Sequence, residues 1–165
     1  MKKASKVLLH FFLILFFVGL EESALSSKLF LNPVVCFVIF FAMSKDRITI
    51  IWPLLGGIFM DFFSIFNFPI FTFSLLALFF IIKFFANKIL TFNNQVSFLI
   101  FSFGGIIAYN IIFLVINLTF YFLKIDDIRL LFNQFYFLHI FINIIFTLLL
   151  LIIFRKNYDK SIFYR

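Results

Sequence analysis

Asp61 is the acidic residue of greatest chemical interest, because it alone lies well inside an apolar segment, WPLLGGIFMDFFSIF. A carboxylate in such surroundings is expensive, by about 2.5 kcal/mol or more at the centre of a bilayer. It therefore normally faces other protein groups or a water-filled cavity, and it has a partner. We expect the partner of Asp61 to indicate what this segment does.

Other polar residues are predicted at a similar depth. Counting 1.5 Å per helical residue from the ends of the apolar segments places Asp61 about 9 Å deep, and His139 and Asn117 about 10 Å deep. Asn143 follows His139 by one helical turn, and Asn110 precedes Asn117 by two, so each pair lines one side of its helix. We predict that Asp61 and His139 approach each other. The residues of this candidate layer are Gly56, Gly57, Asp61, Ser64, Asn110, Asn117, His139 and Asn143.

The candidate layer allows three interpretations. Its side chains can form hydrogen bonds between helices and fix the packing of a bundle that has 33 Phe residues and only 5 Gly. They can also line a hydrated or ligand-binding pocket that carries the charge of Asp61, or a path for protons or ions. We favour the packing interpretation.

The residue combinations that intramembrane hydrolases use are missing from the sequence. Asp61 is the only acidic residue predicted to be buried. A mechanism that needs two neighbouring carboxyl groups is therefore excluded. His10 and His139 are predicted to lie on opposite sides of the membrane and therefore cannot share a metal. Ser64 has no histidine at its depth except His139, and Cys36 is the single cysteine. We therefore expect no enzymatic activity, no metal site and no cofactor.

The elements that position these residues follow from the composition. The chain is 65% hydrophobic, 24% aromatic and 13% charged, which excludes a water-soluble domain and indicates an integral membrane protein. Because about 20 helical residues cross about 30 Å of hydrocarbon, we predict an all-α, six-helix transmembrane bundle forming a single domain over residues 1–165. The predicted spans cover about 7–25, 29–43, 48–66, 69–86, 96–123 and 132–154. Asn32 and Pro33 interrupt the second span, and residues 34–43 alone reach about 15 Å.

The basic residues predict the orientation of this bundle. The net charge of +7 does not indicate nucleic-acid binding, because the charges lie beside apolar runs rather than in one patch. If all six segments cross and the N-terminus is inside, eleven of the 14 Lys and Arg residues lie inside, which follows the positive-inside rule and places both termini in the cytoplasm. The start MKKASKVLLHFF also fits a signal peptide with cleavage near Ala24 and Ser26, which the mass of the mature N-terminus would test.

Trp52 lies near the inner end of its span and is interpreted as an interfacial anchor. His10 is given no role. The pairs Gly56–Gly57 and Gly104–Gly105 predict close approach of helices rather than phosphate binding, since no strand precedes them.

Several motifs along the chain resemble MreD, the rod-shape-determining membrane protein family of bacterial cell elongation. GGIFMDFFS is similar to the family's glycine-rich span, which carries an aspartate followed by a small polar residue. The polar break after the first span, the dipeptide Asn32–Pro33 and the basic loop SKDR match in order, as does Asn143 followed by an apolar run and Arg155–Lys156. The chain departs from the pattern after Ser64, where NFPIF replaces a loop expected to contain glycine.

The resemblance implies a non-enzymatic scaffold in the bacterial cytoplasmic membrane. Such a scaffold would bind an MreC-like bitopic protein and, through it, MreB-like filaments and peptidoglycan synthases. It would have no nucleic-acid partner, and a homodimer is left open. The family is similar in fold to the substrate-binding subunits of energy-coupling vitamin importers. The alternative function is therefore a small-molecule-binding subunit of such an importer, although the Ala-x-x-x-Ala docking pattern of those proteins is absent from this sequence.

Overall fold

The structure is helical throughout the part of the chain that it describes. The computed structural model describes residues 2–21, 32–43, 47–64, 69–89, 95–124 and 136–158, with no strand among them. Its elements are α1 (Lys2–Glu21), α3 (Pro33–Ala42), the 3-10 turn η1 (Arg47–Ile50), α4 (Ile51–Phe63), α5 (Ile70–Ile89), α6 (Gln95–Phe122) and α7 (Tyr136–Tyr158). The all-α prediction is confirmed, and each predicted span overlaps one of the α-helices.

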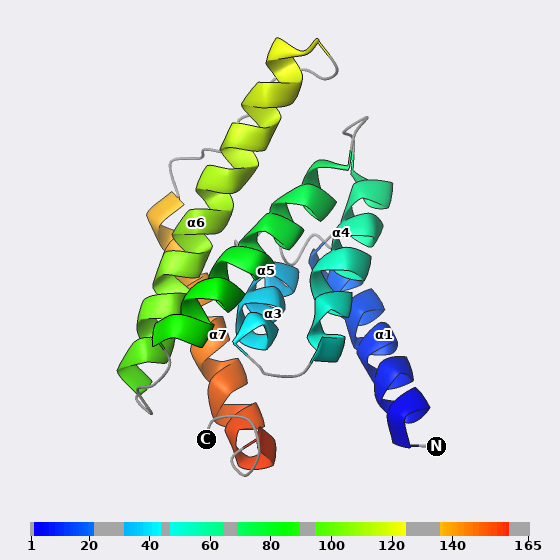
Figure 1. Cartoon of the computed structure of the whole chain (residues 1–165), viewed down its shortest axis with the longest axis vertical. Helices are drawn as coiled ribbons and strands as arrows, with labels where there is room; N and C mark the ends of the chain where they lie inside the picture. The colour runs from blue at the N-terminus through cyan, green and yellow to red at the C-terminus, as the bar shows by residue number, and fades with distance from the viewer. Residues whose placement is uncertain are drawn as a thin grey trace.

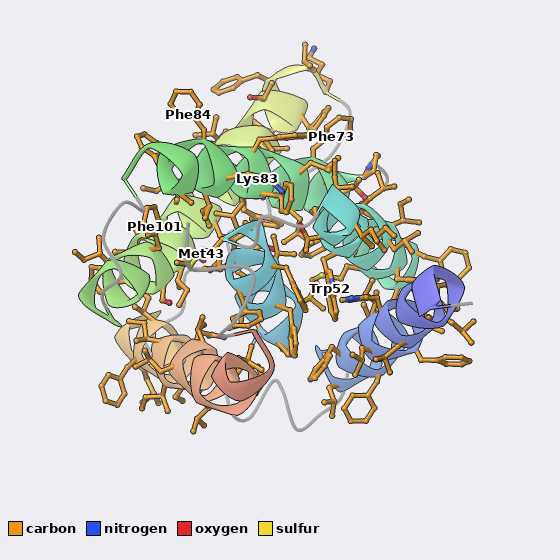
Figure 2. The ribbon with its side chains drawn as sticks, turned by 60° about the horizontal axis from the view of Figure 1, so that its bottom comes forward. Met43, Trp52, Phe73, Lys83, Phe84 and Phe101 are labelled. Atoms are coloured by element: carbon orange, nitrogen blue, oxygen red, sulfur yellow. The ribbon has the colours of Figure 1, made fainter. Side chains whose placement is uncertain are left out.

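The short helix α3 is the centre of the bundle. It packs against α1, α4, α5, α6 and α7, which surround it in Figure 2. Every residue of α3 is buried, because its run of Val, Phe and Ile is apolar on all sides. Pro33 stands in the first turn, where its missing N–H costs no helical hydrogen bond.

The helices alternate in direction and differ in length. α1, α4 and α6 run upward in Figure 1, whereas α3, α5 and α7 run downward, so the start of α1 and the end of α7 lie at the same end.

Within the described residues, one helical segment is long and apolar enough to cross a membrane, namely Ile100–Phe122 of α6. The apolar parts of the other helices are 10–17 residues long, and the 10 residues of α3 reach about 15 Å.

An aromatic stack joins α1, α3 and α4 and corrects the interpretation of Trp52. That side chain is 0% exposed and is therefore a core residue rather than an interfacial anchor. Its ring stacks on Phe37 and Phe41 at centroid distances of 4.9 and 4.8 Å. Its indole N–H donates a hydrogen bond of 2.8 Å to Nδ1 of His10. His10, which was given no role, thus supplies the acceptor that a buried indole N–H needs.

The outer faces of the surrounding helices are apolar. Large hydrophobic side chains are exposed on α1, α4, α5, α6 and α7, including Phe62 at 81% and Phe122 at 77%. Exposed apolar side chains on five helices, together with the long apolar segment of α6, fit association with a membrane.

Candidate functional site: two helix starts held by polar side chains

The carboxylate of Asp61 is bound by the start of the next helix. Its Oδ1 accepts the backbone N–H of Phe71 at 2.8 Å. Its Oδ2 accepts the backbone N–H of Thr72 at 2.8 Å and the Thr72 hydroxyl at 2.6 Å. Phe71 and Thr72 are the second and third residues of α5, so these N–H groups belong to the four that a helix start leaves without intrahelical acceptors.

The sequence explains why the cap comes from another helix. The residue before α5 is Pro69, whose carbonyl accepts the N–H of Phe73 at 3.2 Å. Proline has no polar side chain, so it cannot satisfy the free N–H groups as Ser, Thr, Asp or Asn would at this position. Asp61 does so from the last turn of α4. Its negative charge is also favourable at the positive end of the α5 dipole.

Gly57 brings the two helices close enough for this contact. A Cβ atom at Gly57 would lie 2.9 Å from both the backbone N and Oγ1 of Thr72, and closer still to its Cα. One residue earlier, a Cβ at Gly56 would lie 2.9 Å from a methyl group of Val34 in α3. Consecutive residues point about 100° apart on a helix, so the glycine pair fits α4 against two different neighbours.

Ser64 belongs to the same site and closes the end of α4. Its hydroxyl and its backbone N–H both donate to the backbone carbonyl of Asp61, at 3.0 and 3.3 Å. Asp61 is therefore held through its main chain by Ser64 while its side chain holds α5. Asp61 thus contacts both the end of α4 and the start of α5.

A second helix start is bound in a similar way by Asn143 of α7. Its side-chain Oδ1 accepts the backbone N–H of Asn32, just before α3, at 2.7 Å. The thiol of Cys36 lies 3.3 Å from the same oxygen and 3.5 Å from the Asn143 carbonyl. That carbonyl also accepts the Thr147 hydroxyl at 2.7 Å. Asn143 is 1% exposed, so these bonds form in the core.

The candidate layer of the sequence is thus divided between two places. Asp61, Gly57 and Ser64 meet at the start of α5, whereas Asn143 lies at the start of α3. Asn110 donates from Nδ2 to the carbonyl of Ile106 in its own helix at 2.8 Å.

The other polar members of the candidate layer are Asn117 and His139. Asn117 is buried in α6. The side chain of His139 lies outside the described residues, so its approach to Asp61 stays a prediction.

Sequence reasoning missed three of the residues in these contacts: Thr72, Asn32 and Cys36. A signal was present for one of them. The residue before α5 is Pro69, which has no capping side chain, so a polar residue elsewhere is expected to approach this helix start, and Thr72 lies three residues after Pro69. Asn32 bonds to a residue 111 positions away, and no local signal indicates that contact. Nothing in the local sequence distinguished Cys36 from an ordinary small core residue.

The chemistry available at these sites is hydrogen bonding between helices. Both carboxylate oxygens of Asp61 are engaged by donors of α5. Within the described ranges, no group of three or more His, Cys, Asp or Glu side chains is placed to hold a metal ion. The two sites connect α4 with α5 and α7 with α3 through groups that an apolar environment strengthens.

Comparison of the chain with protein-family models, with curated proteins and with solved structures gave no match.

Proposed function

We propose that this chain is a non-enzymatic membrane scaffold of the bacterial elongation machinery, which binds an MreC-like bitopic protein and thereby helps to organise peptidoglycan synthesis. The observation that carries the proposal is the use of Asp61. In the GGIFMDFFS motif that resembles MreD, the glycine allows close approach and the aspartate holds the next helix. Each distinctive residue of the motif thus has a structural purpose, as expected of a scaffold.

The proposed location is the bacterial cytoplasmic membrane, which the helices cross several times with both chain ends in the cytoplasm. The apolar outer faces of α1, α4, α5, α6 and α7 support this location, because lipid tails can cover them. The alternating helix directions and the shared end for the start of α1 and the end of α7 also support it. The positive-inside distribution of basic residues selects the cytoplasm for that shared end.

The proposed partner binds to the outer helix faces. The central helix α3 is buried on all sides and is closed to a partner. For example, the Phe37 ring of α3 is covered by Phe17 of α1 and Phe146 of α7, at ring-centroid distances of 4.2 and 6.4 Å. A bitopic protein contributes one transmembrane helix, which can pack against any of the five outer helices through van der Waals contact.

Co-purification tests this proposal directly. The full chain and an MreC-like bitopic protein are expressed together in a bacterial membrane, and one is captured through an affinity tag in mild detergent. We expect a complex that survives gel filtration. Recovery of the folded chain without its partner would contradict the proposal. Stabilisation of the chain by a vitamin-type small molecule, or its capture with a coupling ATPase, would favour the importer alternative.

A further inference from the structure

The described helices separate charge strongly between their two ends. The start of α1, the turn η1 and the ends of α5 and α7 all lie at the lower end in Figure 1. We call this the basic end, because eight basic residues and no acidic residue occur in these described segments. They are Lys2, Lys3, Lys6, Arg47, Lys83, Lys88, Arg155 and Lys156. Lys124 follows the end of α6 and Asp61 lies in the last turn of α4, and both of these helix ends point upward in Figure 1.

The basic residues stand close to the apolar parts of their helices. Lys6 immediately precedes the apolar run of α1, Arg155 immediately follows that of α7, and Lys83 lies inside that of α5. At 1.5 Å per residue, positions within two turns of an apolar run lie within about 10 Å of the hydrocarbon boundary. That depth corresponds to the headgroup layer, where lipid phosphates lie.

Lys83 shows how one of these cations is held. Its side chain is half-buried, and its Nζ lies 4.9 Å from the centroid of the Phe79 ring. Figure 2, in which this end comes forward, shows Lys83 on α5. A lysine of this kind lays its methylene chain along apolar surface and keeps its ammonium group at the interface. In this way a cation is accommodated inside the apolar run of α5.

We infer that the basic end binds anionic phospholipid headgroups of the phosphatidylglycerol and cardiolipin class. Ammonium and guanidinium groups at the ends of several helices supply charge-assisted hydrogen bonds to phosphate oxygens. Clusters of four to eight basic residues beside membrane helices attract anionic lipid in this way. The inference rests on the membrane location in the proposed function, but it does not depend on an MreC-like partner.

Thermal unfolding of the purified full chain tests the inference. The chain in neutral detergent is titrated with short-chain phosphatidylglycerol, with phosphatidylcholine of the same chains, and with inorganic phosphate. We expect the unfolding temperature to rise with phosphatidylglycerol alone. A variant with Lys2→Gln, Lys3→Gln and Lys6→Gln should bind this lipid at least about tenfold more weakly. Lys124→Gln, at the opposite end, is the matched control and should bind as the unmodified chain does.

Three results would overturn the inference: equal stabilisation by phosphatidylcholine, equal stabilisation by inorganic phosphate, or an equal loss of affinity in the Lys124→Gln control. If the triple variant loses helical content by circular dichroism, the pair Arg155→Gln and Lys156→Gln replaces it under the same criteria. No partner protein is present in this experiment. Its failure therefore contradicts lipid binding and leaves the co-purification test of the proposed function unaffected.

Discussion

Removal of the Asp61 carboxylate should destabilise the chain, because it removes the polar contacts at the start of α5. Asp61→Ala leaves the N–H groups of Phe71 and Thr72 without their acceptor and removes the bond from the Thr72 hydroxyl. Loss of a helix cap costs about 0.5–2 kcal/mol, and hydrogen bonds to a charged group contribute about 1.5–3 kcal/mol each in net terms. Because the site is only partly buried and water can replace some of these bonds, we expect a loss of about 3 kcal/mol.

The assay is reversible unfolding of the full chain in mixed micelles, followed by circular dichroism. Asp61→Asn keeps one acceptor oxygen, so it should lose about half as much as Asp61→Ala. The control is Phe62→Ala, because Phe62 is the next residue and is 81% exposed. It should change the free energy of unfolding by less than about 1 kcal/mol. An Asp61→Ala variant within about 0.5 kcal/mol of the unmodified chain would refute the capping role.

Three further predictions concern the contacts around α3 and α4. Gly57→Ala should destabilise the chain by about 2 kcal/mol or more, since backbone atoms of Thr72 occupy the space of the added Cβ. The control is Gly104→Ala, whose Cβ would meet nothing within 4 Å and which should be neutral or stabilising. Equal effects of the two substitutions on thermal unfolding would contradict this prediction. Asn143→Ala should cost about 1–3 kcal/mol, because it removes the acceptor for a backbone N–H at the start of α3. Unchanged chemical unfolding would count against that role. His10→Phe should cost about 1–2 kcal/mol by removing the acceptor of the buried indole of Trp52. Emission from this single tryptophan reports the change, and an unaltered spectrum and stability would show that the bond contributes nothing.

The sequence predicted the helices well because long apolar runs and their polar breaks are local properties. The all-α class and the approximate bounds of α4 and α5 follow from such runs, and Pro69 correctly indicated the start of α5. The second span was predicted over 29–43 with an interruption at Asn32–Pro33, and α3 begins at that proline. The central position of α3 was not predicted, since an apolar run does not reveal how many neighbours surround it.

The partners of the polar residues could not be predicted, because they depend on packing between distant segments. Asn32 and Asn143 are 111 residues apart in the chain. Asp61 and Thr72 are only 11 residues apart, but their contact requires the close approach that Gly57 permits. The prediction for Trp52 was wrong for a related reason. A position near the end of a span is typical of an interfacial anchor, whereas the rings of Phe37 and Phe41 enclose this indole in the core.

Amide hydrogen exchange at Phe71 and Thr72 tests the central claim most directly, because it observes the two N–H groups that the Asp61 carboxylate accepts. In the unmodified chain, both amides should be as well protected as those in the middle of α5. In Asp61→Ala, they should exchange rapidly while the middle of α5 stays protected. Rapid exchange in the unmodified chain, or unchanged protection in Asp61→Ala, would contradict the claim that Asp61 holds the start of α5.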